Sequence, residues 1–350
     1  MDRKRFSKQI AKGNREVAGL MEFFETLFGA KQGGHQDLFQ QEVMNWGTEN
    51  KDKTIYYIKD KNVTRLGFFA LYRRWLDYLY FADICGYVPV IYTDSGFAYK
   101  EKKAVHNTTN PFEYYFVQPA GISVEEARHS NRVVLSNHIH RKMVELILTG
   151  GETNYKYTNR YMLLMARVAA KYIKFNPHTQ SYIEESLTKI NFKKDKMLGV
   201  HMRGTDYREM YNDHPVYVTE DECFLQIDRV LDKGMYDRIF LATDDERILE
   251  KFIHRYGDRL CFYEDVKRSR QNKSIAFHQS TREQNKYLLG LEVIRDMYTL
   301  SMCTGLVAGV SQVAICAQIH KMSKKEKYVD KVIIDKGVYS NQKFFRKRVW

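Results

Sequence analysis

The sequence predicts an α/β protein with two Rossmann-like domains that face a central cleft. Between residues 197 and 335, short apolar runs alternate with longer amphipathic segments, as in a parallel sheet that helices cover on both faces. A shorter strand–helix–strand pattern begins at residue 54. With 350 residues, of which 44% are hydrophobic, the chain is long enough to bury two cores.

The first domain is expected over residues 51–191. Runs of β-branched and aromatic residues predict its strands, and one long aromatic segment predicts its first helix. We expect strands at 54–58 and 88–93, and helices at 69–84, 161–175 and 178–190. Residues 1–50 are expected to form a helical lead-in with one amphipathic piece at 17–28.

The second domain is expected over residues 192–336, after the lysine-rich boundary 191–196. Its strands are predicted from apolar runs and its helices from apolar residues at helical spacing. We expect strands at 197–201, 237–243, 259–263, 306–310 and 328–335, and helices at 219–232, 245–256, 284–303 and 311–321. Residues 337–350 are expected to form a basic, aromatic tail.

The net charge of +13 indicates an anionic partner: nucleic acid, a membrane surface or a phosphorylated substrate. Much of the excess lies in 324–327 and 343–348, where a solvated surface is the simplest interpretation. Phe344, Phe345 and Trp350 are interleaved with these charges, which makes peripheral membrane contact through the basic termini the alternative.

The five cysteines are scattered and show no Cys-x-x-Cys spacing, as is typical of reduced core thiols. The sequence has neither a signal-peptide pattern nor an apolar run long enough to cross a bilayer. We therefore expect a cytoplasmic protein, with the inner face of the membrane as the place of any peripheral contact.

Polar side chains follow the first strand of the second domain, at the edge where ligands gather in open α/β sheets. His201 and Arg203 alternate, so their side chains leave on the same face, one suited to a base or sugar and the other to phosphate. Gly204 permits a close approach of the backbone to a ligand. The structural alternative is a His201 bonded to main chain and an Arg203 paired with Asp206.

The second strand runs into Asp244 and Asp245. The stretch 243–246 also has the pattern of a capping box, so at least one of these carboxylates is expected to cap the following helix. The other carboxylate remains a candidate for the cleft.

Asp296 lies in the middle of a helix among apolar residues, where a lone carboxylate needs a partner. The structural candidate is Arg295 or an arginine of another helix. The functional candidate is a guanine edge, which offers two N–H donors.

Ser311 and Gln312 follow a further strand and open a helix. The hydroxyl and the free backbone N–H groups form either a phosphate seat or a simple serine N-cap.

Several chemistries are excluded by missing motifs. The chain has neither a G-x-G-x-x-G nor a P-loop motif, and no Asp-x-Asp pair for a metal-bound nucleotide diphosphate. A pyrophosphate would therefore have to be met by arginine and helix termini. His138 and His140 have a spacing that a metal could use, but without a third ligand nearby we expect no metal and no cofactor.

Four motifs in order resemble the α1,6-fucosyltransferase superfamily, which includes the nodulation fucosyltransferases, the core N-glycan fucosyltransferases and, more distantly, the protein O-fucosyltransferases. The motifs are His201-Met-Arg203-Gly-Thr-Asp206, Leu241-Ala-Thr-Asp-Asp245, Asp296-Met-Tyr-Thr-Leu300 and Ser311-Gln312. The resemblance implies a B-type glycosyltransferase fold, GDP-fucose as donor, and inversion at the anomeric carbon without metal.

By matched position, the resemblance implies that His201 and Asp296 contact guanine and ribose. It implies that Arg203, Ser311 and Gln312 hold the pyrophosphate. Asp245 would support the donor pocket from the neighbouring strand end.

Two departures from the family pattern affect the expected chemistry. The core N-glycan enzymes carry a second arginine where this chain has Gly204, so part of the stabilisation of the leaving group must come from elsewhere, for which Arg208 is a candidate. Tyr207 replaces a basic residue of those enzymes. Glu209 lies where the family carries an acidic residue and is the candidate general base, with Asp206 as the alternative.

We therefore expect an inverting transferase that moves fucose from GDP-fucose to a hydroxyl of a glycan or glycolipid, with no nucleic acid as partner. One alternative is a capsule or O-antigen transferase that uses another nucleotide sugar or makes an α1,2 linkage. Another is a basic protein without catalysis that binds nucleic acid or membrane through its termini.

Overall fold

The computed structural model describes residues 42–60, 63–64, 66–93, 96–138, 140–141, 144 and 158–340. The helix expected at 17–28 and the basic aromatic segment 343–350 lie outside the described residues. No described helix combines the length and the apolar character that crossing a membrane requires.

The chain divides into two compact units. The first comprises the described residues of 1–60, 74–92 and 118–151, and the second comprises those of 61–73, 93–117 and 152–350. The described residues 158–191 thus belong to the second unit, whereas the expected boundary placed them in the first domain. The helices α6 (Asn159–Tyr172) and α7 (Pro177–Lys189) confirm the two helices expected there, with slightly earlier ends.

The first unit contains a mixed sheet with strand order β1-β4-β2-β3. The predicted strands are present as β2 (Ile55–Ile58) and β3 (Val88–Ile91), which pair in parallel. The sequence analysis missed β1 (Val43–Met44), β4 (Val133–Leu135) and the helix α4 (Val124–Arg128), which are too short to give a periodic signal. The predicted helix at 69–84 is α3 (Phe68–Cys85), whose residues are shared between the two units.

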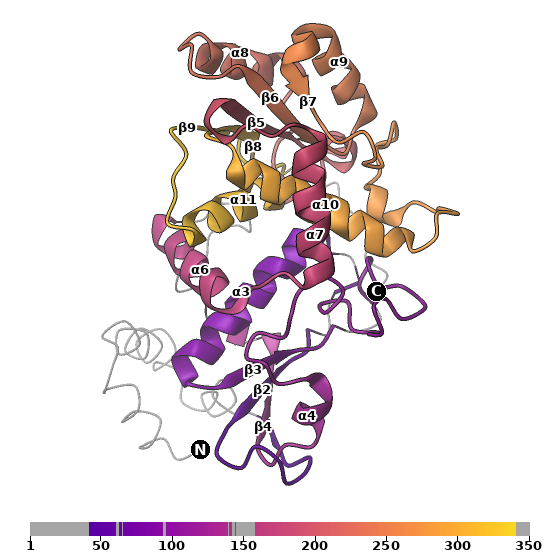
Figure 1. Ribbon diagram of the computed structural model, residues 1–350, viewed down its shortest axis with the longest axis vertical. Coiled ribbons are helices and arrows are strands. Elements are labelled where there is room, and N and C mark those ends of the chain that lie inside the picture. The colour runs from indigo at the N-terminus through magenta and orange to yellow at the C-terminus, as the bar shows by residue number, and fades with distance from the viewer. Residues whose placement is uncertain are drawn as a thin grey trace. The chain divides into compact units, whose positions relative to one another are not determined.

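The second unit contains a five-stranded parallel sheet with the order β7-β6-β5-β8-β9, as Figure 1 shows. The predicted α/β class is therefore confirmed. The strands are β5 (Met197–Met202), β6 (Arg238–Thr243), β7 (Leu260–Cys261), β8 (Gly305–Gly309) and β9 (Asp330–Ile334). The connecting helices are α8 (Glu220–Leu231), α9 (Glu246–Tyr256), α10 (Asn285–Met302) and α11 (Gln312–Ser323).

The strand order reverses between β5 and β8. The chain first moves outward from β5 to β6 and β7, and then returns to place β8 and β9 on the other side of β5. In open α/β sheets the ligand crevice lies outside the carboxyl ends of the strands at such a reversal. The topology therefore directs attention to the residues that follow β5 and β8.

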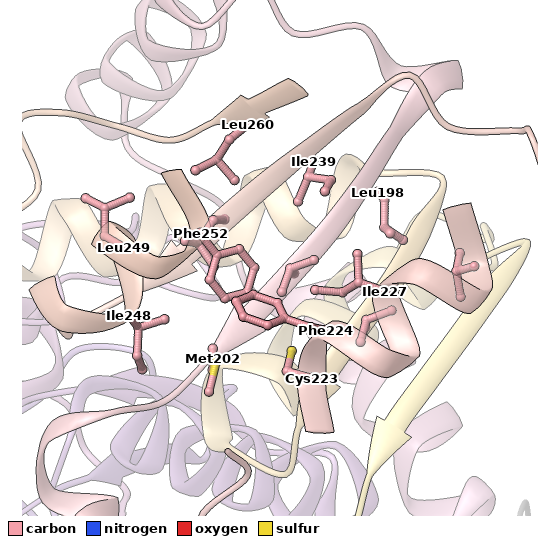
Figure 2. Close-up of a cluster of buried hydrophobic side chains, with 14 of the residues drawn as sticks. Leu198, Met202, Cys223, Phe224, Ile227, Ile239, Ile248, Leu249, Phe252 and Leu260 are labelled. Atoms are coloured by element: carbon pink, nitrogen blue, oxygen red, sulfur yellow. The ribbon is translucent and has the colours of Figure 1, made fainter. Parts of the chain in front are cut away.

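The alternation of side chains along β5 decides which face each residue serves. Leu198 and Met202 belong to the apolar core that α8 and α9 cover, as Figure 2 shows. A Cβ on Gly199 would lie 3.2 Å from the side chains of Leu300 and Cys303, so the opposite face of β5 packs against α10. Because side chains alternate along a strand, His201 shares this α10 face.

Two local expectations are settled by the caps and the cysteines. The N-cap of α9 is Asp245, which confirms that one of the two carboxylates caps this helix, whereas the capping box expected from Thr243 to Glu246 is wrong. A capping box is instead present at the start of α8, from Thr219 to Glu222. All five cysteines are free, and all but Cys85 are buried, as expected for reduced core thiols.

Candidate active site

Arg203 follows β5 and is held between two carboxylates. Its guanidinium lies 2.8 Å from Asp206 Oδ1 and 2.6 Å from Asp244 Oδ2, and its side chain is 24% exposed. Burial alone would lower the pKa of Arg203, but the two carboxylates raise it above its ordinary value. The ion pair with Asp206, which was the structural alternative, is thus present, and part of the charged group still reaches solvent.

The loop after β5 is fixed by both aspartates of the β6 end. Asp244 accepts hydrogen bonds from the backbone N–H of Gly204 (3.0 Å) and the hydroxyl of Thr205 (2.6 Å). Asp245 Oδ2 accepts from the backbone N–H of Thr205 (3.1 Å). Thr205 has a φ of +37°, which is unusual for a β-branched residue and persists only because these contacts impose it.

Asp245 is fully buried, and its carboxylate serves protein groups. Its partners include the backbone N–H of Arg247 (2.9 Å), the Arg247 guanidinium (2.6 Å) and Arg208 Nε (3.2 Å). These donors lower the pKa of Asp245 although burial alone would raise it. The carboxylate therefore shapes the loop that carries Arg203, and its predicted contribution to a donor pocket is through that loop.

Gly204 has a steric reason to be glycine. A Cβ at this position would lie 2.3 Å from Asp245 Cβ and 2.5 Å from its Oδ2. An arginine, as in the core N-glycan enzymes, therefore has no room in this loop. The buried Asp245 side chain therefore requires a glycine at position 204.

We expect Gly204→Ala to lower the free energy of unfolding by about 1–3 kcal/mol, because the new methyl group must displace a packed side chain. Gly67→Ala is the matched control, since a Cβ there meets nothing within 4 Å. Urea denaturation of both variants measures the difference. An equal stability of the two variants would contradict this account of Gly204.

Arg208 is not free to stabilise a leaving group. It donates to Asp245 Oδ2 and to Glu220 Oε1 (2.7 Å), and its guanidinium lies 4.4 Å from the ring centre of Tyr217. The sequence analysis suggested it as a substitute for the missing second arginine. Its contacts instead tie the loop after β5 to α8.

The two candidate bases line one cavity of about 500 Å³. Glu209 is half-buried there and accepts a hydrogen bond from Asn272 Nδ2 (3.2 Å). Asp206 is buried and already accepts from Arg203 and from the Thr205 hydroxyl (3.1 Å). The remaining lining residues are Tyr211, Asn272, Lys273, Ser274 and Phe277.

The segment 272–277 was not recognised from the sequence. Ser274 lies 3.5 Å from the Arg203 guanidinium, so the segment forms a wall beside the charged cluster. It belongs to the long polar connection between β7 and α10, which has no apolar periodicity, and its only sequence signal is its position after a strand end.

His201 is a buried, neutral histidine with one free lone pair. Its Nδ1 lies 3.1 Å from the carbonyl oxygen of Ala242 and therefore carries the proton, whereas Nε2 is buried and has no hydrogen-bond partner among the residues that the structure describes. Burial and the neighbouring Arg203 lower its pKa to about 3. An unpaired buried acceptor costs free energy unless a ligand satisfies it.

Asp296 is a second buried group without a partner. It is 8% exposed, and burial raises its pKa to about 7. Arg295, the expected structural partner, instead pairs with Asp265 (3.0 Å) and with the hydroxyl of Ser186 (3.1 Å). Throughout the described residues, no hydrogen bond or ion pair reaches the Asp296 carboxylate, which leaves the ligand interpretation open to it.

Ser311 is the N-cap of α11, as one of its two interpretations predicted. Its hydroxyl accepts from the backbone N–H of Ala314 (3.1 Å), and Gln312 begins the helix. The first turn of a helix is a favourable place for an anion, because its N–H groups and the helix dipole carry partial positive charge. Because β8 is next to β5, this helix start and Arg203 follow neighbouring strand ends.

The two histidines with metal-like spacing do not share a site. His140 is buried, stacks on Phe81 with ring centres 4.2 Å apart, and bonds the hydroxyl of Tyr56 (2.9 Å). His138 is exposed. Among the described residues no group of three potential metal ligands comes together.

The chain is similar to known proteins both in sequence and in fold. A family model described as alpha-(1,6)-fucosyltransferase N- and catalytic domains matches residues 157–326. No curated protein matches the chain.

Among solved structures, the chain is similar to NodZ α-1,6-fucosyltransferase soaked with GDP-fucose, with 15% identity and a TM-score of 0.45 over 76% of this chain and 92% of that one. NodZ from Bradyrhizobium gives 14% identity and a TM-score of 0.45 over 76% and 93%. POFUT1 in complex with GDP gives 9% identity and a TM-score of 0.47 over 80% and 98%.

The family match covers all four motifs from which the resemblance was drawn. It spans the loop after β5, the end of β6, the middle of α10 and the start of α11. The match confirms that resemblance: over residues 157–326 the chain is similar to the α-(1,6)-fucosyltransferase family.

Proposed function

We propose that this protein transfers fucose from GDP-fucose to a hydroxyl of a glycan or glycolipid, with inversion at the anomeric carbon and without metal. The observation that carries the proposal is the partly exposed Arg203, which stands beside a cavity lined by two carboxylates, Asp206 and Glu209. A departing diphosphate needs positive charge, and an attacking hydroxyl needs a base. The family match over residues 157–326 supports the choice of donor.

The donor site in this proposal lies where the strand order reverses. Asp296 accepts N–H groups of guanine, and His201 Nε2 accepts a hydrogen bond from the nucleoside. The pyrophosphate rests against Arg203 and the first turn of α11, where Ser311 and Gln312 stand. Both unpartnered buried acceptors are then satisfied by one ligand.

The reaction proposed here is a direct displacement. A carboxylate takes the proton of the acceptor hydroxyl, the hydroxyl oxygen bonds to the anomeric carbon, and the bond from that carbon to the GDP oxygen breaks. Arg203 stabilises the charge that develops on GDP. Lys273 lines the same cavity and brings a further positive charge, whereas Gly204 provides none.

The proposal predicts selective stabilisation by GDP. Thermal unfolding is measured with GDP, UDP, ADP and CMP in turn, with EDTA present, because a ligand that binds only the folded state raises stability by mass action. We expect an upward shift of the unfolding temperature with GDP alone. A shift with UDP or CMP alone would replace the donor, and no shift with any nucleotide would contradict a nucleotide-sugar transferase.

Glu209 is the stronger candidate for the base, because Asp206 is held in an ion pair with Arg203. We expect Glu209→Gln to lower kcat about 100- to 10,000-fold while the shift with GDP stays unchanged. Asp206→Asn is the comparison variant, which should weaken the positioning of Arg203 and therefore lower the GDP-induced shift. A Glu209→Gln enzyme with normal kcat would assign the base elsewhere.

A further inference from the structure

Arg268 lies in a loop that two neighbouring elements hold in place. The backbone of the next residue, Ser269, donates to the carbonyl of Asp244 (3.0 Å) and accepts from the N–H of Glu246 (3.1 Å). On the other side, the N–H of Lys267 lies 3.3 Å from Glu292 Oε2. The loop therefore connects the end of β6 to α10.

The contacts with α10 fix which stripe of the helix faces this loop. Besides the contact at Glu292, the hydroxyl of Tyr263 lies 2.8 Å from Thr299 Oγ1. Positions 292, 296 and 299 are spaced by four and three residues, so they lie on one face of the helix. Asp296 stands between the two contacts and hence faces the loop that carries Arg268.

Arg268 and Asp296 are opposite charges that do not pair. Within the part of the chain that the structure describes, the Arg268 guanidinium donates to the carbonyls of Val266 (3.3 Å) and Tyr263 (2.9 Å) and lies 5.4 Å from the ring centre of Phe262, while its Nε is buried without a hydrogen-bond partner. Asp296 has no partner either among the described residues. Burial lowers the pKa of Arg268 and raises that of Asp296 to about 7, so the mutual attraction of the two charges offsets only part of the loss of water.

Facing groups of this kind would form a salt bridge if their role were structural. Among the described residues no salt bridge joins them, and the pair suits a ligand that presents donors to the carboxylate and an acceptor to the guanidinium. The edge of guanine has this pattern, with N1–H and the 2-amino group as donors and O6 as the adjacent acceptor.

We propose that Arg268 is a specificity-determining residue that donates to O6 of guanine while Asp296 accepts from N1–H and the 2-amino group. This inference rests on the proposed function, because it assigns a residue to the donor site. Adenine reverses the pattern, with an amino group facing the cation and a lone pair facing the carboxylate. The pair therefore excludes ADP-sugars by repulsion as well as by lost hydrogen bonds.

The test compares GDP with 6-thio-GDP, which keeps both donors but replaces O6 by a much weaker acceptor. In the unaltered protein we expect GDP to bind about 10- to 100-fold more tightly, the value of one hydrogen bond to a charged group. In Arg268→Met the two nucleotides should bind with equal affinity, because the donor to O6 is removed. Arg270→Met, which removes an exposed partner of Glu250 two residues away, keeps the preference.

A second pair of ligands, GDP and IDP, distinguishes the role of Asp296 from that of Arg268. IDP lacks only the 2-amino group of GDP. The preference for GDP over IDP should therefore disappear in Asp296→Asn and persist in Arg268→Met. A structural role for Arg268 predicts that the variant loses affinity for GDP and 6-thio-GDP equally, with an unchanged ratio, and this result overturns the proposal.

The outcome stays informative if Arg268→Met does not fold. The unaltered protein alone must then discriminate GDP from 6-thio-GDP, and equal affinities overturn the role of Arg268. Failure of the proposed function is a different result, because in that case the unaltered protein binds neither nucleotide.

Discussion

Arg203→Ala is expected to lower kcat for fucose transfer at least 100- to 1,000-fold. In the proposed reaction the guanidinium meets negative charge that appears on GDP only as the sugar leaves, so its loss raises the barrier more than it weakens ground-state binding. The loss is severe in this chain for two reasons. Gly204, next to Arg203, brings no charge of its own, and Arg208 is bound to Asp245 and Glu220.

The alanine variant also leaves Asp206 and Asp244 without their shared cation. We expect it to lose about 2 kcal/mol of stability, the order of a hydrogen bond between charged groups. Arg203→Lys keeps the charge, but an ammonium cannot span two carboxylates and a phosphate as a guanidinium does. It should therefore retain stability and lose most of the activity.

Arg255→Ala is the control for loss of an ion pair alone, because Arg255 pairs with Asp228 on the outer helices and touches none of the cavity residues. Initial rates with GDP-fucose, together with urea denaturation, separate catalysis from stability. An Arg203→Ala enzyme with near-normal kcat would overturn the mechanism and leave the ion pair with Asp206 and Asp244 as a purely structural cluster.

The parallel sheet of the second unit was predictable because each of its elements carries its own signal. β5 is buried along its whole length and is apolar up to His201, and the start of α8 is marked by a capping box. The sheet of the first unit was only half predicted. β1 has two residues and β4 three, and their pairing depends on partners far away in the sequence.

The candidate site shows the same division between local and distant information. Arg203 and Asp296 were recognisable because a charged side chain at a strand end or within an apolar helix is locally unusual. The roles of Asp244 and Ser274 were not, since each acts on a residue of another segment, 40 or more positions away. The cost of a side chain at Gly204 depends on Asp245, which no local pattern in the first strand reveals.

Asp296→Asn is expected to stabilise the ligand-free protein and to abolish the response to GDP. Burial raises the pKa of Asp296 to about 7 from an ordinary value near 3.8. A carboxyl whose folded-state pKa is raised contributes stability that is complete below pH 3.8 and is lost as pH rises through 7. At pH 8 the unaltered protein therefore holds an unpaired carboxylate at a cost on the order of a few kcal/mol, which the neutral amide removes.

GDP binding depends on the same carboxylate, but ionisation acts in the opposite direction: it destabilises the ligand-free protein and favours binding. The carboxylate must be ionised to accept two N–H groups of guanine, so we expect the affinity of the unaltered protein for GDP to increase as pH rises through 7. Asparagine presents an N–H to the guanine amino group, and affinity should fall about 100-fold and lose its pH dependence. The same amide can donate to O2 of xanthine, so preference should move toward XDP.

Glu292→Gln provides the matched control, because Glu292 is a buried acid one turn earlier on α10 that does have a partner, Arg282 at 2.6 Å. Burial raises the pKa of Glu292 too, although Arg282 offsets part of this effect, so its neutralisation should stabilise the protein at pH 8 less than Asp296→Asn does. Thermal unfolding of both variants at pH 6 and pH 8, with and without GDP, measures these changes in stability and in GDP binding. If Asp296→Asn is less stable than the unaltered protein at pH 8, or binds GDP normally, the carboxylate has a structural partner and the guanine site lies elsewhere.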